Sequence, residues 1–225
     1  MNFRNKLLIS LNALFNHRKF KKIYFVLLFL MVTIGIIDGE GYTLYPGRDA
    51  RKICDKYVLD QKLYLHQNSK DIIDQWSSRY FQGLNEYIRG FIKPSFSKIK
   101  EYEKFRRELS SLIESTKGLC TDTILFRGEI DVDIESRFRI GEENIFSGFI
   151  ATSFSEKKAR NFSKSLSNSG YLIKIRAKKN TKGIAINGNE VGRYRGQKEW
   201  LLNENQRYMT LDIDEKKKII EIKLL

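Results

Sequence analysis

Two apolar runs carry an arginine and adjacent hydroxyls at places where a strand could present them to a ligand. Arg127 closes one run and Gly128 follows it, so a ligand could approach the backbone closely there. A guanidinium in that setting suits phosphate, which it can bind through two hydrogen bonds. Thr152 and Ser153 are neighbours in a second run. On a strand one hydroxyl should therefore face a cleft and the other should face away.

Two further pairs have spacings that place both side chains on one face. Gln197 and Glu199 stand two apart at the start of an apolar strand, where an amide and a carboxylate could hold a substrate and stabilise a developing cation. Asn85 and Arg89 stand four apart on a predicted helix. Taken singly, each of these features also fits a surface ion pair, an ordinary strand or a solvated polar stripe.

Histidine and cysteine usage narrows the chemistry. His17 and His66 are the only histidines and no CxxC motif occurs, which argues against Ser-His-Asp, Cys-His and histidine-rich metal sites. The chemistry must then come from carboxylates, hydroxyls and amides, and we expect no metal. Cys54 and Cys120 could form one disulfide in an exported protein or could both stay free.

The elements that must position these residues follow from hydrophobic periodicity. Apolar residues recur at intervals of three and four over residues 72–91 and 102–112, which predicts helices between about residues 50 and 114, with a break at Pro94. Short β-branched or aromatic runs separated by turn residues then predict strands. They lie at residues 123–126, 148–154, 171–175, 184–186, 200–202, 208–211 and 219–225. Helices followed by strands indicate an α+β fold with a mixed or antiparallel sheet.

The N-terminus differs from the rest of the chain. Residues 23–37 carry no charge and follow a basic stretch, which is typical of a signal peptide and also of an uncleaved membrane anchor. We expect export with cleavage, residues 1–41 being the signal peptide or anchor and residues 42–225 one domain. The formal net charge of +14 for 225 residues favours acidic partners such as nucleotides, nucleic acid, anionic lipid or an acidic protein.

The order and spacing of Arg127, Ser153 and the Gln197-x-Glu199 motif resemble the Arg–Ser–Glu signature of the clostridial-toxin-like mono-ADP-ribosyltransferases. The resemblance covers residues 71–225. Within that group the sequence is most similar to the small Rho-inactivating exoenzymes, through residues 125–128, residues 148–153 and Gln197 with Glu199. Ala151 departs from the pattern, because the family usually has a serine there.

The resemblance implies a fold and a set of roles. The fold would pack N-terminal helices on a mixed, mostly antiparallel two-sheet β core, and NAD would be the co-substrate without a metal. Glu199 would stabilise the positive charge that develops on the ribose, and Ser153 would orient it. The residues assigned to NAD are Arg127, Asn85, Arg89, Phe162, Lys164, Gly128 and Thr152.

The resemblance also implies an acceptor. Gln197 and the preceding Tyr194 suit an asparagine of a Rho-type small GTPase, since an amide can pair with an amide through two hydrogen bonds. The alternatives are arginine, DNA guanine, transfer to water as an NAD glycohydrolase, and a non-enzymatic binding module. We expect a monomer, and we recognise no receptor-binding or translocation segment.

Overall fold

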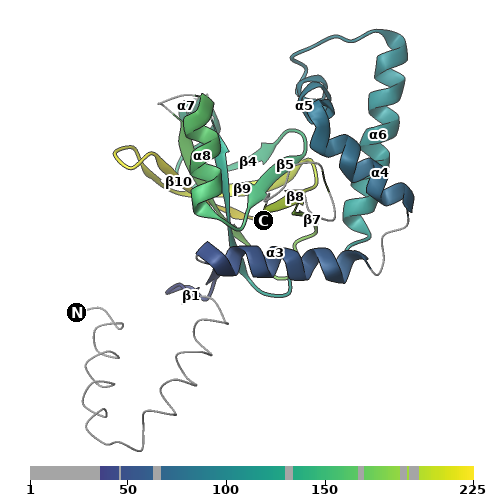
Figure 1. Cartoon of the computed structure of the whole chain (residues 1–225). Helices are drawn as coiled ribbons and strands as arrows, with labels where there is room; N and C mark the ends of the chain where they lie inside the picture. The colour runs from purple at the N-terminus through teal and green to yellow at the C-terminus, as the bar shows by residue number, and fades with distance from the viewer. Residues whose placement is uncertain are drawn as a thin grey trace, which may run out of the picture. The chain divides into compact units, whose positions relative to one another are not determined.

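The computed structural model (Figure 1) describes residues 36–45, 47–62, 67–129, 134–166, 170–187, 192 and 198–225. The chain divides into the units Met1–Ile36 and Ile37–Leu225, and the second is considered below. The predicted signal peptide or anchor lies almost wholly outside the described residues. Within them, no helix is both long and apolar enough to cross a bilayer.

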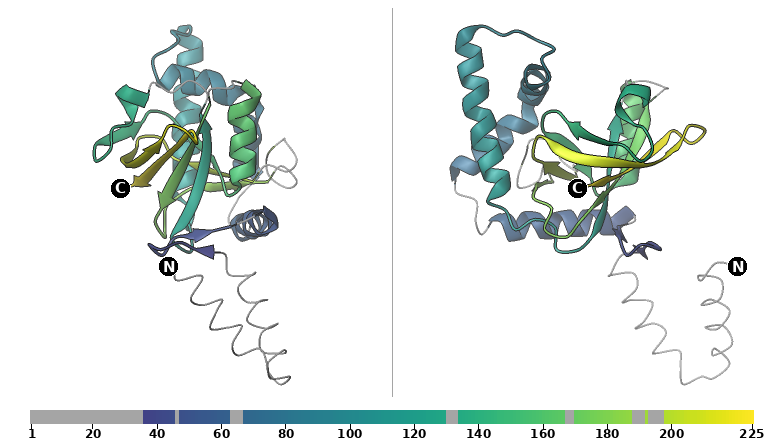
Figure 2. Two further views of the ribbon diagram at one scale, coloured as in Figure 1. Left: turned by 90° about the vertical axis from the view of Figure 1, so that its left-hand side faces the viewer. Right: turned by 180° about the vertical axis from the view of Figure 1, so that it is seen from behind.

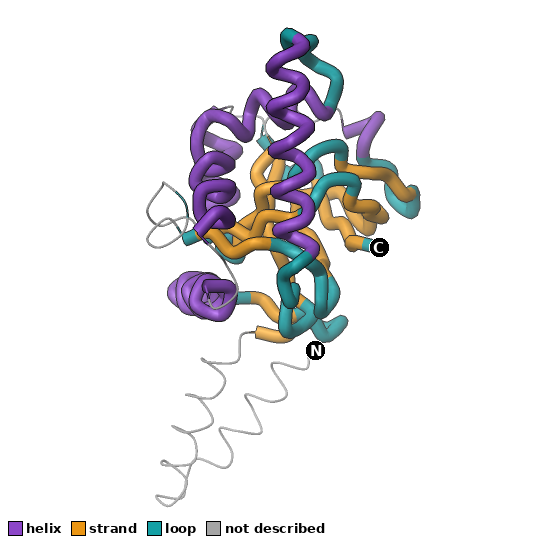
Figure 3. The backbone as a smooth tube through the Cα atoms, turned by 90° about the vertical axis from the view of Figure 1, so that its right-hand side faces the viewer, coloured by secondary structure: helices purple, strands orange, loops and turns teal. Residues whose placement is uncertain are grey.

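Helices dominate the first half of the described unit. They are α3 (Gly47–Lys62), α4 (Gln67–Gln75), a π-helical turn (Trp76–Tyr80), α5 (Phe81–Ile88) and α6 (Phe96–Glu114). Helix α6 buries Tyr102, Phe105, Leu109 and Ile113, the three- and four-residue spacing that the sequence predicts. Figure 3 shows α6 in front of the strands, with α3 seen end-on at the lower left. The helical region is thus confirmed, with additional breaks.

The second half supplies most of the sheet. Its strand order is β4-β9-β10-β6-β3-β5-β8-β7, with β1 and β2 attached through β3. The β10–β6 and β2–β3 pairs are parallel and the other pairs are antiparallel. The bounds are β1 (Ile36–Ile37), β2 (Thr43–Leu44), β3 (Thr123–Glu129), β4 (Glu143–Phe146), β5 (Ile150–Ser153), β6 (Tyr171–Ala177), β7 (Ile184–Ile186), β8 (Glu199–Leu202), β9 (Gln206–Asp214) and β10 (Ile219–Leu224). The α+β class with a mixed, mostly antiparallel sheet is confirmed.

Two neighbouring strands of the sheet have very little pairing between them. Strands β3 and β5 are joined through a single residue pair, Phe126 with Ser153, in the part of the chain that the structure describes. On one side lie β4, β9, β10, β6 and β3, and on the other lie β5, β8 and β7. The expected two-sheet core therefore takes the form of two strand groups connected at a seam.

Two helices absent from the sequence prediction follow β3 and β5. They are the short α7 (Ile134–Arg137) and α8 (Glu156–Leu166). Helix α8 packs on β3, apart from the α4–α6 group (Figure 2). It escaped prediction because its sequence is mostly polar, with Ala159 and Ser163 among the few side chains that it buries.

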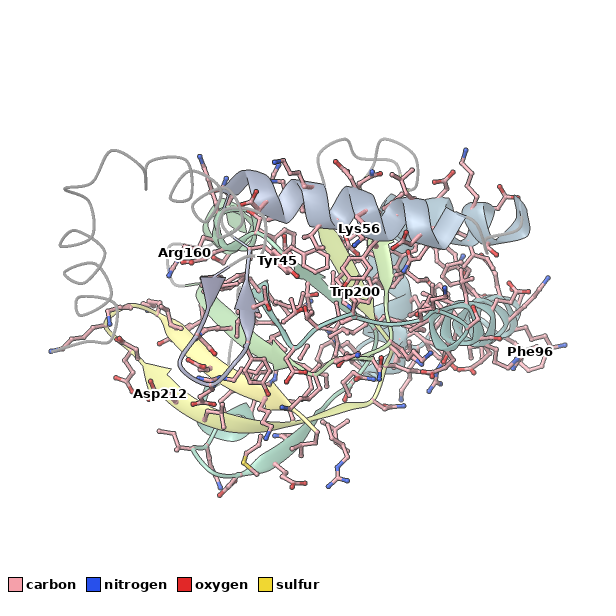
Figure 4. All side chains as sticks on the ribbon, turned by 90° about the horizontal axis from the view of Figure 1, so that it is seen from below. Tyr45, Lys56, Phe96, Arg160, Trp200 and Asp212 are labelled. Atoms are coloured by element: carbon pink, nitrogen blue, oxygen red, sulfur yellow. The ribbon has the colours of Figure 1, made fainter. Side chains whose placement is uncertain are left out.

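Aromatic packing fixes α3 against the sheet. Trp200 of β8 is fully buried (Figure 4), and Tyr57 of α3 packs on it with ring centroids 4.9 Å apart. Gln61 of α3 also pairs with the β7 edge, donating to the Gly183 carbonyl and accepting from the Ala185 amide. The helix thereby covers a sheet edge that would otherwise be open to pairing.

The two cysteines are both free. Cys54 is buried and donates to the carbonyls of Ile186 and Glu199, while Cys120 is exposed and lies 3.0 Å from the Tyr57 hydroxyl. Of the two alternatives left open by the sequence, the structure therefore has unpaired cysteines.

Candidate active site

A cavity of about 570 Å³ opens between α5, α8 and strands β3, β5 and β8. Its volume falls within the range typical of small-molecule sites. Its walls contain most of the residues that the sequence singles out. The lining residues are Trp76, Ser77, Phe81, Gln82, Asn85, Glu86, Arg89, Phe126, Arg127, Gly128, Ala151, Thr152, Ser153, Lys158, Ala159, Phe162, Lys198 and Glu199.

Strand register brings the central residues together. Ser153 on β5 lies opposite Phe126 on β3 and opposite Glu199 on β8. Burial alternates along β5, so Ala151 and Ser153 are half-buried on one face and Thr152 is buried on the other. The adjacent hydroxyls thus point in opposite directions, as strand geometry requires. The Thr152 hydroxyl donates to the Trp200 carbonyl, so its bonding is structural.

The Glu199 carboxylate accepts a hydrogen bond from the indole N–H of Trp76, with Nε1 3.2 Å from Oε1. Burial raises the pKa of Glu199 to about 7, while the Trp76 hydrogen bond and the charge of Arg127 lower it. The carboxyl group therefore ionises near neutral pH. Trp76 was absent from the predicted site because its spacing fitted an apolar helix face. The helical segment that begins at this residue is kinked, because Ser78 within it has a non-helical backbone (φ −85°, ψ −172°).

Ser153 holds the strand end beside this carboxylate. Its hydroxyl donates to the Lys198 carbonyl at 3.0 Å and accepts from the Ser155 amide at 3.0 Å. Both contacts fix the backbone immediately before Glu199 and after β5. The influence of Ser153 on Glu199 in this structure is therefore through the backbone of residue 198.

Arg127 is held by two protein contacts at the other side of the seam. Its Nε donates to Glu129 Oε2 at 2.7 Å, and its Nη1 donates to the Ala151 carbonyl at 3.0 Å. The Ala151 backbone makes this contact, so the departure from serine at that position leaves it intact. A guanidinium fixed in this way is ready to bind a ligand without further ordering.

Glu129 lies among three arginines. Besides Arg127 it meets Arg137, whose Nη1 is 3.5 Å from Oε1. Burial opposes ionisation, yet the charges of Arg127, Arg137 and Arg89 hold the pKa of Glu129 below its ordinary value. Burial and the nearby charge of Arg127 also lower the pKa of Arg89. One carboxylate among three guanidinium groups leaves an excess of positive charge, which favours an anionic ligand.

Two predicted ligand residues on α5 contact the loop before β5. The Asn85 amide donates to the Phe149 carbonyl at 3.2 Å and accepts from the Phe149 amide at 3.0 Å. Arg89 Nε donates to the Ser147 carbonyl at 3.1 Å. Gly148 between them has a φ of +85°, and a Cβ there would lie 2.6 Å from Asn85 Oδ1. Asn85 therefore ties α5 to β5, and Arg89 lies at the cavity wall.

Helix α8 forms the remaining wall. A Cβ added to Gly128 would lie 2.2 Å from the Ala159 carbonyl oxygen, so α8 approaches β3 to a distance that only glycine permits. Phe162 lines the cavity and is 51% exposed. Lys164 lies on the same helix, but its side chain is outside the described part of the structure.

The comparisons with known proteins agree with this geometry. Residues 55–224 match the family model described as ADP-ribosyltransferase exoenzyme. The chain belongs to this family. A search of curated proteins finds no match.

Solved structures of similar fold are toxins and exoenzymes. The exoenzyme C3stau2 from S. aureus, solved with NAD, has a TM-score of 0.64 at 15% identity, covering 82% of this chain and 98% of its own. The C3 exoenzyme of Clostridium limosum has a TM-score of 0.63 at 16% identity, with the same coverage. Vis toxin, an ADP-ribosyltransferase from Vibrio splendidus, has a TM-score of 0.63 at 14% identity, covering 79% of this chain and 85% of its own.

The sequence assigns two residues between Gly192 and β8 to acceptor recognition. Gln197 and Tyr194 fall outside the described residues. The Gly192 amide donates to Asp74 Oδ1 of α4 at 3.1 Å. Helix α4 thus contacts Gly192, and β8 begins at Glu199.

The Trp76–Glu199 hydrogen bond predicts a pH effect in the exoenzyme. Trp76→Phe keeps an aromatic ring against Phe81 and Phe149 but removes the donor to the ionised carboxylate. The pKa of Glu199 should rise by about 1 to 2 units, since such a bond is worth about 1.5–3 kcal/mol. We expect the acid limb of kcat/KM, near pH 7 in the wild type, to move to higher pH.

The measurement is a pH–rate profile of both proteins. Near pH 7 the variant should be roughly fivefold to fiftyfold slower, and the two rates should converge above about pH 10, where both carboxylates are ionised. Melting curves show whether the variant is folded. An unshifted acid limb in a folded variant would mean that Trp76 does not tune Glu199.

Proposed function

We propose that this protein is an NAD-dependent mono-ADP-ribosyltransferase that modifies an asparagine of a Rho-type small GTPase. The observation that carries the proposal is the placement of Glu199 and Arg127 in one cavity, on opposite sides of the β3–β5 seam. A carboxylate for a developing cation and a guanidinium for phosphate are the two groups that NAD cleavage needs.

The reaction we propose begins with cleavage of the bond between the ribose C1′ and the nicotinamide nitrogen. The electron pair leaves with nicotinamide, and positive charge develops on the ribose. Ionised Glu199 stabilises that charge, which is a transition-state interaction and therefore accelerates the reaction. The acceptor amide nitrogen then bonds to C1′ and loses a proton to solvent.

The remaining cavity residues would bind the rest of NAD. Arg127 and Arg89 suit the pyrophosphate, because they line one cavity and their charges interact. The exposed ring of Phe162 can pack against a base or the nicotinamide. The staphylococcal exoenzyme of similar fold was solved with NAD, which supports NAD as the co-substrate.

The direct test is incubation of the protein with isotope-labelled NAD and a cell lysate, followed by mass spectrometry of the labelled residue. We expect label on an asparagine of a Rho-type GTPase. Label on arginine or on DNA would contradict the proposed asparagine acceptor but would still agree with NAD cleavage. Nicotinamide release with no labelled macromolecule would identify an NAD glycohydrolase.

Substitution of Gln197 should separate NAD hydrolysis from transfer to protein. In Gln197→Ala we expect protein transfer to be lost and NAD hydrolysis to continue, because the carboxylate of Glu199 is retained. Tyr194→Ala should remove a contact with the acceptor protein worth about 2 kcal/mol. The transfer rate should therefore fall while NAD hydrolysis continues. Nicotinamide release and acceptor labelling, measured in parallel, check both.

Gln197→Glu is the matched variant for acceptor choice. It supplies a carboxylate that can pair with a guanidinium, so activity on agmatine should appear while asparagine transfer falls. Wild-type activity on free arginine would contradict the asparagine assignment.

We propose that the protein is exported and that the mature form starts after Ile37. The support is the uncharged run of residues 23–37 behind a basic stretch. N-terminal sequencing of protein from the culture medium should begin in residues 38–42. Recovery of the full-length chain from the membrane fraction alone would favour the anchor.

A further inference from the structure

Two phenyl rings project at the junction of α5 and α6. Phe91 is 74% exposed and Phe96 is 73% exposed, the highest values among the large apolar side chains that the structure describes. The connecting loop lies at the far end of the helical group (Figures 1 and 2), and Figure 4 shows Phe96 at the outer edge of the molecule. Large apolar side chains exposed together are typical of interaction surfaces.

The charged residues of the segment that carries these rings have one sign. Residues 88–100 contain four basic residues and no acidic one. Lys93 and Lys100 are exposed, and Lys100 Nζ lies 4.6 Å from the centre of the Phe96 ring. Lys98 pairs with Glu101 at 2.9 Å, and Arg89 is turned toward Ser147, so neither contributes fully to the charge of this surface.

The backbone at the start of α6 adds to this positive charge. Helix α6 begins at Phe96, and Ser95 at its N-cap makes no side-chain capping bond. The first amides of α6 therefore present partial positive charge beside the two lysines. Residues 91–100, named here the α5–α6 tip, thus combine two projecting rings, two exposed lysines and a helix N-terminus.

We propose that the α5–α6 tip docks on an anionic membrane surface. The phenyl rings would enter the interfacial layer of the bilayer, while Lys93 and Lys100 would contact acidic lipid headgroups. The tip projects at the end of a helix pair, whereas a protein partner of ordinary size needs a patch of about 800 Å². Projecting rings flanked by lysines therefore fit a lipid surface better than a protein surface.

This docking has a consequence for the cavity. Arg89 lines the cavity and stands two residues before Phe91. A tip placed on a membrane would therefore bring that wall of the cavity close to the membrane plane. The proposal does not rest on the catalytic assignment, since none of Phe91, Lys93, Phe96 and Lys100 lines the cavity.

The test reports on the tip itself, because the apolar N-terminal run could bind lipid independently. An environment-sensitive fluorophore is attached at Ser95→Cys in the full chain carrying Cys120→Ser, since Cys54 is buried. We expect a blue-shifted emission with phosphatidylcholine vesicles containing phosphatidylserine. The same dye at Ser111→Cys, exposed near the other end of α6, should not respond.

Matched variants separate the rings from the charges. Phe91→Ser with Phe96→Ser should weaken vesicle affinity at the Ser95 probe at least tenfold, through the loss of two buried rings. Ile140→Ser, which removes an apolar side chain 63% exposed elsewhere, should leave it unchanged. Lys93→Glu with Lys100→Glu should reduce the affinity similarly and abolish its salt dependence.

Three outcomes would overturn the proposal. They are an equal response to uncharged phosphatidylcholine vesicles, an equal response at Ser111, and a Ser95 probe that ignores vesicles but responds to a purified GTPase. The last would assign the tip to a protein partner. Melting curves measured on the same proteins show whether each variant is folded.

Discussion

Glu199→Gln should abolish both nicotinamide release and ADP-ribose transfer while leaving NAD affinity nearly unchanged. The amide keeps the shape of the side chain and can still accept from Trp76 Nε1, but it carries no charge to stabilise the oxocarbenium-like ribose. The ground-state contacts that we assign to Arg127 and Arg89 remain. The checks are single-turnover kinetics and a fluorescence titration with NAD.

The result that contradicts this role is quantitative. A rate above about one-tenth of the wild type corresponds to less than about 1.4 kcal/mol in the barrier, which is too little for the principal electrostatic group. A Glu199→Asp variant is the matched control, because it keeps the charge and shortens the side chain. It should retain more activity than the glutamine variant.

Glu199→Gln should also stabilise the fold at alkaline pH. The pKa of Glu199 is raised from 4.5 to about 7 in the folded state, so folding favours its protonated form. The stability it contributes is fully present below pH 4.5 and is lost as pH rises through about 7. Glutamine cannot ionise. We therefore expect Glu199→Gln to have a free energy of unfolding higher than the wild type at pH 8, by on the order of 1–3 kcal/mol, and a higher melting temperature. At pH 4.5 the two proteins should melt at nearly the same temperature.

Arg127→Ala should weaken both NAD binding and the fold. A charge-assisted phosphate contact is worth about 1.5–3 kcal/mol, or roughly a tenfold to 150-fold change in Kd. The substitution also leaves the Glu129 carboxylate, whose side chain is 12% exposed, without its partner at 2.7 Å. A buried carboxylate that loses its nearest cation is strongly destabilising. Isothermal titration and urea unfolding measure the two effects.

Glu129→Gln in the Arg127→Ala background separates affinity from stability. The double variant has no uncompensated carboxylate, so it should recover much of the stability but none of the NAD affinity. The arginines hold the pKa of Glu129 low, so its stabilisation is present above the unfolded pKa and is lost as pH falls through the folded one. A single Arg127→Ala variant with unchanged Kd would place the phosphate contact elsewhere.

The sequence predicted the strands better than the contacts between them. All seven expected strands occur, because β-branched and aromatic runs bounded by turns mark half-buried strands. The two-residue strands β1 and β2 were missed because they are too short to show a pattern. β4 was missed because it lies at the sheet edge, with three of its four residues not fully buried. α8 was missed because its sequence is mostly polar and gives no apolar stripe.

The site residues that belong to short motifs could be predicted, whereas contacts between residues far apart in the sequence could not. Arg127, Ser153 and Glu199 follow from motif spacing, and the structure brings all three to one cavity. Glu129 could have been found, since it lies two residues after Arg127 on the same strand face. The Trp76–Glu199 bond joins residues 123 apart in sequence, and no local pattern announces such a contact.

The seam between β3 and β5 determines how the domain should open. Arg127 and Glu129 belong to one strand group and Ser153 and Glu199 to the other, with one residue pair bridging the two. Separating the groups would dismantle the active site while the ladders inside each group stay intact. In native-state hydrogen exchange, amides of β5, β8 and β7 should therefore behave as a cooperative unit distinct from those of β3, β6 and β10. A ligand that spans the seam would tie the two units together and slow exchange in both.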